Sequence, residues 1–296
     1  MLETISQKSI ITTAFLSAAP LWLTKRMYST GAINSRKVFE TVAGVIRSEI
    51  SSHKKSMNPN NKFRDYIDGY LAEMEVRQRK DPNTHFTLQK LSEMVRILFG
   101  AGSSAVQESI EFLLLLSVRY SEHQKRIHEE IDSVVGRDRS PCYADRLHMP
   151  FTQAFINESF RYKTKLPFNL MRCTTKDTTV LGHFIPKDTR VIVNTYALHS
   201  DPKVWVNPKE FIPNRFLSSD GKKVLKYETF IPFLIGKRSC VGETLGRVEV
   251  FLYFVSILQR YRVSAKNVDI MSVIAKSLTM NAKPKDDLIL EFHKRL

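Results

Sequence analysis

Residues 233–242 read FLIGKRSCVG and stand directly before the last predicted helix. Gly236 and Gly242 permit a positive φ and leave room for a flat group to approach the backbone. Cys240 lies just ahead of the helix N-terminus, and Arg238 precedes it by two residues. The free amides of a helix N-terminus and a nearby cation favour a thiolate over a thiol. The segment therefore presents a charged sulfur in an open turn.

A thiolate held in a glycine-rich turn is either a nucleophile or a metal ligand. A nucleophile needs a base such as histidine; residues 233–242 contain none, so a base would have to come from a distant part of the chain. Zinc needs further cysteine or histidine ligands at short spacing, and this segment offers none. A single thiolate is a ligand that a haem iron can use.

A second signal lies in the helix predicted from Phe151 to about Tyr162. Glu158 and Arg161 stand three residues apart on its apolar stripe, where they are neighbours. The alternative is an ordinary exposed ion pair. The outward positions, however, already hold polar residues: Gln153, Asn157 and Lys163. We therefore expect the pair to be buried, and buried charges need partners.

The rest of the chain predicts a mainly α protein with a minor β region. Thr87 can cap a helix of about thirty residues, and the all-round apolar run Leu113–Leu116 directs this helix through the interior. A shorter helix over Ser121–Val135 ends at Gly136, which suits a left-handed cap. Short strands with turn residues between them follow over residues 178–193.

Three further segments complete this outline. Residues 36–79 have a helical, strongly charged pattern that the polar run 56–61 breaks into two helices. Residues 201–216 are rich in proline and aromatic residues with little periodicity, so we expect an ordered meander. The last helix is predicted from about Glu243 to Arg260.

Composition narrows the class of protein. Hydrophobic residues make up 43% of the 296 residues, enough for a sizeable core, which excludes a disordered chain. Three cysteines at irregular spacing, Cys142, Cys173 and Cys240, make a disulfide framework implausible and suit a reducing compartment. The formal net charge of +15 predicts attraction to a nucleic acid, an anionic membrane or an acidic protein, and charge alone does not choose among them.

An uncharged stretch, Ile10–Leu23, lies near the start of the sequence, with Lys25 and Arg26 after it. Its 14 residues are fewer than the roughly 20 that span a bilayer as a helix. Three interpretations stay open. The stretch is an interfacial segment with Trp22 at the headgroup level, a buried element, or a secretory signal without an obvious cleavage site.

Residues 233–242 match, position by position, the F-x-x-G-x-R-x-C-x-G loop of the cytochromes P-450, the haem-thiolate monooxygenases. Other motifs keep the family's order. Glu158-x-x-Arg161 resembles its E-x-x-R helix, and residues 211–216 resemble the meander whose arginine, here Arg215, completes a buried Glu-Arg-Arg network. The resemblance implies the C-terminal part of the cytochrome P-450 fold.

Roles at the cofactor site follow from this resemblance. Cys240 would be the axial ligand of haem b, iron protoporphyrin IX. Arg238 and Arg172 would donate hydrogen bonds to the haem propionates. Phe233 would pack against the thiolate side of the ring, unless it only fills the core. The remaining cofactor-binding residues would be Gly236, Gly242 and Ala101.

The long central helix carries the predicted catalytic residues. Ala101-Gly102 resembles the A-G-x-x-T stretch that lies over the haem, and Gly102, Ser103 and Ser104 are the implied catalytic positions. Ser104 stands where an acid is usual, and Ala105 stands where a threonine hydroxyl assists protonation of bound oxygen. Proton delivery would fall to Ser104, Ser103 or water. Family members that rearrange peroxides also lack this threonine, so a haem-thiolate isomerase or dehydratase of an oxygenated lipid stays an alternative.

The extent of the resemblance implies a single incomplete haem-thiolate domain over residues 1–296. Residues 1–86 would be membrane-proximal helices, which favours the interfacial interpretation of Ile10–Leu23. Residues 87–296 would hold the central helix, the E-x-x-R helix, the meander and the cysteine loop. The family's N-terminal anchor and first helices have no counterpart in the match. A truncated, catalytically silent membrane-surface protein is therefore a further alternative.

The implied reaction inserts one oxygen atom from O2 into an apolar small molecule: a xenobiotic, a steroid or a fatty acid. Residues 166–170 and 277–280 would line the substrate pocket. Electrons would come from NADPH through an acidic reductase. This partner would dock on basic residues that otherwise form a solvated surface, namely Lys226, Lys237 and Arg247.

Residues 151–261 are most similar to the microsomal drug- and steroid-metabolising branch of the family. This similarity implies the cytosolic face of the endoplasmic reticulum membrane. The positive charge is then explained by a membrane surface and an acidic redox partner, and no nucleic acid is expected.

Overall fold

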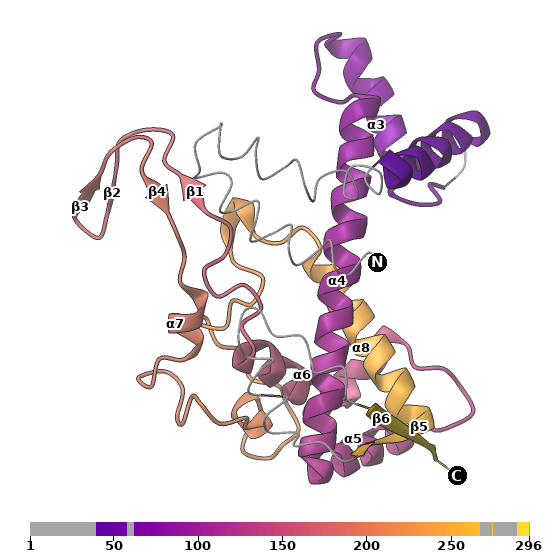
Figure 1. Ribbon diagram of the computed structural model, residues 1–296, viewed down its shortest axis with the longest axis vertical. Helices are drawn as coiled ribbons and strands as arrows, with labels where there is room; N and C mark the ends of the chain where they lie inside the picture. Colours follow the sequence, from indigo (N-terminus) through magenta and orange to yellow (C-terminus); the bar gives the residue numbers. More distant parts are fainter. Residues whose placement is uncertain (1–39, 58–61, 267–273, 275–288, 296) are drawn as a thin grey trace. The chain divides into compact units, whose positions relative to one another are not determined.

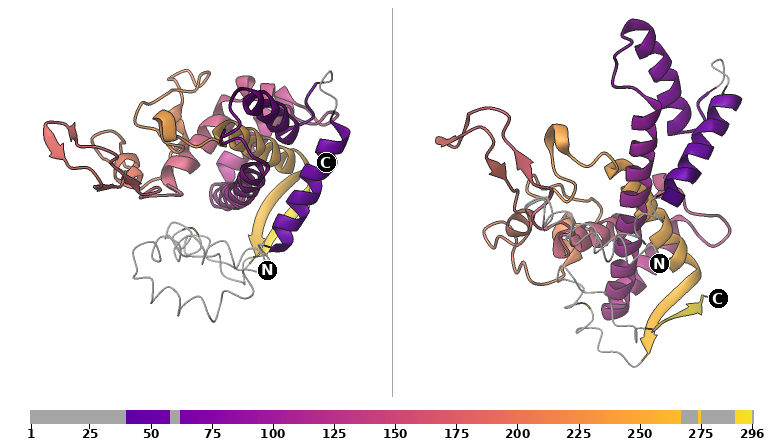
Figure 2. Two further views of the ribbon diagram at one scale, coloured as in Figure 1. Left: turned by 90° about the horizontal axis from the view of Figure 1, so that it is seen from above. Right: turned by 45° about the horizontal axis from the view of Figure 1, so that its top comes forward.

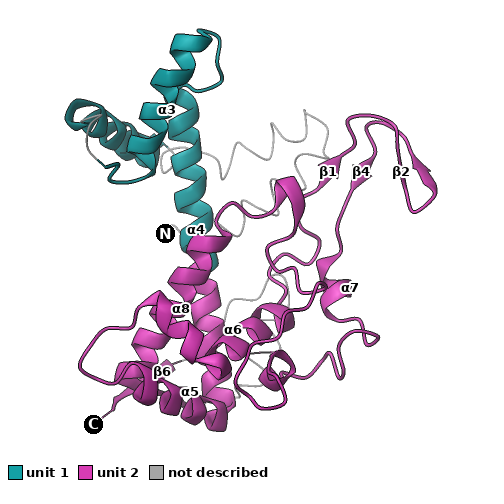
Figure 3. Ribbon diagram, turned by 180° about the vertical axis from the view of Figure 1, so that it is seen from behind, with its two compact units in different colours: residues 1–105 teal, residues 106–296 magenta. Residues whose placement is uncertain are grey.

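The computed structural model describes residues 40–57, 62–266, 274 and 289–295. The chain divides into two compact units, residues 1–105 and 106–296, which Figure 3 shows in different colours. The predicted class is confirmed, because helices dominate the described part and its strands are short. The predicted single incomplete domain stays a prediction.

Unit 1 contains a helix over residues 40–56, helix α3 (Tyr66–Lys80) and the first part of helix α4 (Leu88–Arg119). The break predicted at residues 56–61 is confirmed, since one helix ends at residue 56 and the next begins at Tyr66. Apolar side chains from these helices form the core of the unit: Ile46, Ile50, Ile67, Tyr70, Leu71, Met74 and Leu91.

Helix α4, the long helix of Figure 1, has 32 residues and begins where the sequence predicts. Thr87 Oγ1 accepts a hydrogen bond from the Lys90 N–H at 3.2 Å. This bond satisfies one of the amides that a helix N-terminus leaves without an intrahelical acceptor. The run Leu113–Leu116 in the second half of α4 is buried, as its all-round apolar character predicts.

The core of unit 2 combines the second half of α4 with three helices: α5 (Ser121–Val134), α6 (Pro150–Tyr162) and α8 (Glu243–Arg260). Phe155 of α6 stacks on Phe254 of α8, with ring centroids 5.8 Å apart. Gly136, with a φ of 70°, ends α5 as predicted, and its N–H donates to the Ile131 carbonyl at 2.9 Å. The bounds of α8 agree with the sequence prediction.

Within its described residues, unit 2 carries three antiparallel pairs of strands. They are β1 (Arg172–Cys173) with β4 (Arg190–Val191), β2 (Thr178–Val180) with β3 (His183–Ile185), and β5 (Tyr261–Lys266) with β6 (Ile289–Lys294). The β2–β3 hairpin turns at Gly182, with a φ of 84°, and projects from the helices of its unit in Figures 1 and 2. The strands over residues 178–193 confirm the prediction, whereas the β5–β6 pair was not predicted.

Short helical segments connect the larger elements of unit 2. They are η1 (Tyr143–His148), α7 (Thr195–His199), η2 (Pro213–Phe216) and η3 (Gly236–Arg238). The meander predicted over residues 201–216 is irregular apart from η2, which confirms that prediction.

Two sequence predictions fall on residues outside the described part. These are the interfacial segment Ile10–Leu23 and the pocket segment at residues 277–280. Among the described residues, no helix combines the length and the apolar character needed to cross a membrane.

From two histidines of unit 2 we predict that the free energy of unfolding decreases as the pH falls. Burial lowers the pKa of His128 and of His199 to about 4, and the charges of Arg295 and Arg161, respectively, act in the same direction. In the unfolded chain each histidine has a pKa of about 6.5, so as the pH falls it binds a proton in the unfolded chain before it does so in the folded chain. The stability that each neutral ring contributes is therefore complete above about pH 6.5 and is lost as the pH falls towards 4.

Urea unfolding followed by circular dichroism over this pH window measures the effect, and we expect the midpoint to decrease steadily. His128→Asn removes one titrating ring and should flatten the dependence. His183→Asn on exposed β3 is the matched control and should leave the dependence unchanged. A midpoint that stays constant across the window in the unmodified chain would contradict this prediction.

Candidate functional site

The Cys240 loop, defined as residues 233–242, is closed on itself by backbone hydrogen bonds. The Cys240 N–H donates to the Phe233 carbonyl at 2.8 Å, and the Ser239 N–H donates to the Gly236 carbonyl at 3.1 Å. Gly236 has a φ of 78°, a left-handed conformation in which a side chain would be strained. The loop therefore depends on glycine at this position, as the sequence predicts.

Cys240 is exposed immediately before α8. The Glu243 N–H, at the start of α8, donates to the Cys240 carbonyl at 3.4 Å, so the helix follows the cysteine without a further loop. Both glycines of the loop permit a positive φ; Gly236 has one, whereas Gly242 has a φ of −88°. A Cβ at Gly242 would lie 3.8 Å from Cys240 Sγ, an ordinary van der Waals distance, so Gly242 lies next to the thiol.

The two arginines predicted to bind propionates lie next to each other. Nη2 of Arg172, on β1, donates to the backbone carbonyl of Arg238 in the Cys240 loop at 3.3 Å. Among the described residues, neither guanidinium forms an ion pair with a carboxylate of the protein. Their charge is therefore suited to an acidic group supplied by a ligand.

Phe233 joins the Cys240 loop to the helical core. Its half-buried ring meets Phe160 of α6 edge to face at 5.7 Å between centroids, and the Arg247 guanidinium of α8 lies 4.8 Å from its centroid. Core filling is thus one role of Phe233. Its contact with a haem stays a prediction.

Apolar side chains close in sequence to Cys240 are unusually exposed. Ile235, Val241 and Leu245 all lie within five positions of the cysteine and are 74%, 87% and 62% exposed. Exposed apolar side chains are available to contact an apolar ligand. A haem has an apolar ring, a metal that takes one thiolate, and acidic propionates; the apolar side chains, the accessible thiol and the cation of Arg172 fit these three parts.

The buried Glu158 carboxylate accepts four hydrogen bonds. Arg161, on the same helix, donates two at 2.7 Å; Arg215 donates one at 3.0 Å; and the Ile212 N–H donates one at 2.9 Å. The side chains of Glu158, Arg161 and Arg215 are 0%, 1% and 9% exposed. The predicted buried pair and its third charge are confirmed, and the exposed ion pair is excluded.

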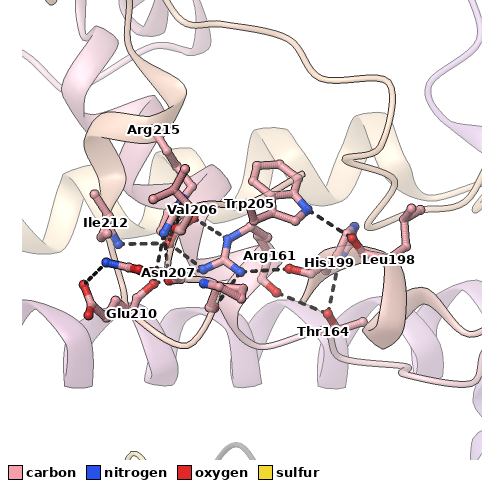
Figure 4. A network of polar contacts seen from close by, with 12 residues as sticks. Arg161, Thr164, Leu198, His199, Trp205, Val206, Asn207, Glu210, Ile212 and Arg215 are labelled. Atoms are coloured by element: carbon pink, nitrogen blue, oxygen red, sulfur yellow. Dashed lines mark hydrogen bonds and ion pairs between the residues drawn. The ribbon is translucent and has the colours of Figure 1, made fainter. Parts of the chain in front are cut away.

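The same two arginines organise the meander, as Figure 4 shows. Nη1 of Arg161 donates to the carbonyls of His199 and Pro208, both at 2.9 Å. Nη1 of Arg215 donates to the Val206 carbonyl at 2.8 Å. An irregular segment has few backbone partners of its own, so these side chains supply donors to its carbonyls.

The predicted catalytic residues, Gly102, Ser103 and Ser104, lie in one stretch of α4 together with Ala101, which was predicted to bind the cofactor. Ser103 Oγ donates to the Phe99 carbonyl at 2.7 Å, and Ser104 Oγ donates to the Gly100 carbonyl at 3.2 Å. This stretch belongs to unit 1, whereas the Cys240 loop belongs to unit 2. The approach of these residues to a haem therefore stays a prediction.

Unit 1 holds a second set of residues with metal-ligand chemistry, His53, Asp65 and Asp68. Nδ1 of His53 lies 2.9 Å from Asp68 Oδ1, and Arg64 donates to both oxygens of Asp68 at 2.7 Å. The Arg64 guanidinium lowers the pKa of the Asp68 carboxyl well below its usual range and occupies the positions that a cation would need. The set is a salt-bridged link between two helices.

Sequence reasoning missed two residues that support the site. Glu130 of α5 accepts the Phe151 and Thr152 N–H groups, each at 2.8 Å, and so caps α6 from a neighbouring helix. His199 bonds through both ring nitrogens. Neither residue belongs to a local pattern, because its partners are distant in the sequence.

Comparison with known proteins agrees with this geometry. The cytochrome P450 family model matches residues 5–290. The chain belongs to the cytochrome P450 family. These comparisons confirm the prediction that the chain is a cytochrome P450 of the microsomal type.

The chain is similar to cytochrome P450 2C4 of Oryctolagus cuniculus, with 41% identity over 233 residues, 77% of this chain and 47% of that protein. It is 36% identical to cytochrome P450 2U1 of Homo sapiens over 76% of this chain and 41% of that protein. Cytochrome P450 1A3 of Oncorhynchus mykiss is 38% identical over 75% of this chain and 43% of that protein. The chain thus spans less than half the length of these three relatives.

Removing one partner of the buried network should cost far more than removing one partner of a surface pair. In Arg161→Leu the Glu158 carboxylate loses its bidentate partner inside the core, and we expect a loss of about 3–5 kcal/mol in the free energy of unfolding. Arg137→Leu in the same unit is the control. Its ion pair with Asp132 spans 4.0 Å between half-exposed side chains, and such pairs contribute about 0.2–1 kcal/mol.

Chemical denaturation of the two variants measures this difference. Equal losses, or a loss below about 1 kcal/mol for Arg161→Leu, would mean that the network does not hold unit 2 together.

Proposed function

We propose that this cytochrome P450 is a haem-thiolate monooxygenase that inserts one oxygen atom from O2 into an apolar small molecule. The substrate class is a xenobiotic, a steroid or a fatty acid, and the electrons come from NADPH through a reductase. The observation that carries the proposal is the Cys240 loop, where an exposed thiol stands at the start of α8 beside exposed apolar side chains. Family membership supports the same reaction class.

The proposed cofactor is haem b, with Cys240 as its iron ligand. A haem bound through a thiolate supplies oxygen activation, since the sulfur pushes electron density towards the iron. The protein's own part is to fix the sulfur. The hydrogen bond from the Cys240 N–H to the Phe233 carbonyl holds the cysteine backbone. Arg172 and Arg238, which lie next to each other, would bind the propionates. The residues proposed to lie against the ring are Phe233, Gly236, Gly242 and Ala101.

The proposed proton donors are the hydroxyls of Ser103 and Ser104. In the structure each hydroxyl donates to a carbonyl one turn earlier on α4. Each would turn away from that carbonyl to pass its proton on, and its oxygen would then accept a proton from water. Gly102 lies in open space on this helix, because a Cβ there would meet nothing within 4 Å outside its chain neighbours and its own helix backbone. General acids placed in this way contribute about 10²–10⁴-fold to a rate.

The proposed location is the cytosolic face of the endoplasmic reticulum membrane, with an acidic reductase as the protein partner. Lys237, within the Cys240 loop, and Lys226, seven residues before the loop begins, are exposed and can attract such a partner. Arg247 pairs with Glu243 at 2.9 Å, so its charge is already partly compensated. Exposed apolar residues are available for an apolar substrate after α6: Leu166, Phe168 and Leu170.

Ala105 favours a second candidate function, a haem-thiolate isomerase or dehydratase of an oxygenated lipid, because such a reaction needs no hydroxyl at this position. The assay that separates the two supplies either NADPH, reductase and O2, or a lipid hydroperoxide alone. A catalytically silent protein is the third alternative. It would lack the red-shifted absorbance band that a haem with a thiolate ligand shows when reduced and bound to carbon monoxide.

Introducing a hydroxyl at position 105 tests the monooxygenase proposal. We expect Ala105→Thr to raise the product formed per NADPH oxidised by roughly several-fold, because the hydroxyl assists proton delivery. Ala105→Val has the same shape without the hydroxyl and should stay at the level of the unmodified chain. Both variants are assayed with purified reductase. Equal coupling in all three proteins, or product from the hydroperoxide alone, would contradict the proposal.

A further inference from the structure

His199, the last residue of α7, is 1% exposed, and the proposed reaction assigns it no role. The Ile231 N–H lies 3.1 Å from its Nε2, and the Thr164 hydroxyl lies 3.0 Å from its Nδ1. A backbone N–H can only donate, so Nε2 accepts and the proton of the neutral ring is on Nδ1. Thr164 Oγ1 therefore accepts a hydrogen bond from the ring.

On one side, His199 is tied twice to the buried charge network. Thr164 Oγ1, which accepts from the ring, donates to the Arg161 carbonyl at 3.2 Å. The His199 carbonyl accepts from Nη1 of Arg161 at 2.9 Å. Figure 4 shows Arg161, Thr164 and His199 in this arrangement. Both the ring and the backbone of the histidine are thus placed by the end of α6.

On the other side, the ring holds the entry to the Cys240 loop. Ile231, whose N–H donates to the ring, stands two residues before Phe233, and its carbonyl accepts the Leu234 N–H at 3.0 Å. The Phe233 carbonyl in turn accepts a hydrogen bond from the Cys240 N–H at 2.8 Å. The Phe230 ring packs against the imidazole, with centroids 5.8 Å apart. A short chain of hydrogen bonds therefore leads from the histidine to the cysteine.

We propose that His199 is a positioning residue for Cys240. The neutral ring of His199, protonated on Nδ1, connects the buried Glu158 network to the loop that carries the sulfur. The inference rests on the proposed role of Cys240 as the haem ligand. Burial and the charge of Arg161 hold the pKa of His199 at about 4, so near neutral pH the ring carries no charge and Nε2 can accept from Ile231. A protonated ring would present a second donor to this N–H.

Two amide variants separate the two ring bonds. His199→Gln keeps an acceptor near the position of Nε2, whereas His199→Asn keeps a donor near Nδ1 and loses the acceptor for Ile231. His183→Asn on exposed β3 is the matched control for the substitution itself. All variants are compared with the unmodified full chain loaded with haem, and their global stability is measured by urea unfolding.

Hydrogen exchange of the Ile231 amide is the first readout. We expect exchange about fivefold faster in His199→Asn, which corresponds to the loss of one hydrogen bond, and near the unmodified rate in His199→Gln. The second readout is the share of haem that shows the red-shifted thiolate band when reduced and bound to carbon monoxide. This share should fall in His199→Asn and be retained in His199→Gln and His183→Asn. A merely structural role would change both His199 variants in proportion to their loss of global stability, which would overturn the proposal.

The unmodified chain gives a third readout that needs no variant. Nitrogen-15 spectra of labelled histidine should show the His199 ring protonated on Nδ1, and a ring protonated on Nε2 would overturn the inference even if a variant fails to fold. Absence of the thiolate band in the unmodified chain would overturn the proposed function instead. In that case the Ile231 amide exchange and the nitrogen-15 spectra still test the hydrogen bond between His199 and Ile231.

Discussion

Taking the Glu158 carboxylate out of water costs several kcal/mol unless charges and hydrogen bonds replace its hydration. Unit 2 meets this requirement with Arg161 from the same helix, Arg215 from the meander and the Ile212 N–H. Because the two arginines also donate to backbone carbonyls of the meander, one buried charge fixes both a helix and an irregular segment. Arg215 thereby holds the meander in place, although most of the meander has no regular secondary structure.

The Cys240 loop has the opposite character, because its groups are accessible rather than buried. Its backbone is fixed by the bond between Cys240 and Phe233 and by the left-handed conformation of Gly236. The sulfur and the apolar residues near it remain exposed. A rigid backbone with an accessible sulfur suits a ligand that must be held at one distance and one orientation. His199 connects this loop to the buried network.

Sequence patterns predicted the features that depend on neighbouring residues. The Thr87 cap, the end of α5 at Gly136 and the buried Glu158–Arg161 pair each follow from spacing within one helix. Pairings between distant residues left no such pattern. The β5–β6 strands are separated by residues 267–288, and His199 meets a partner 32 residues away at Ile231. The glycines of the Cys240 loop permit a positive φ at both positions, and Gly236 has one whereas Gly242 has a φ of −88°.

The central claim is that Cys240 is the sulfur that binds the haem iron. Its most direct test is the absorbance spectrum of the reduced, carbon-monoxide-bound protein in three single variants: Cys240→Ser, Cys142→Ser and Cys173→Ser. All three thiols are exposed, so accessibility alone does not distinguish them. We expect only Cys240→Ser to lose the red-shifted thiolate band. A band that persists in Cys240→Ser, or that disappears in either control, would show that Cys240 is not the ligand.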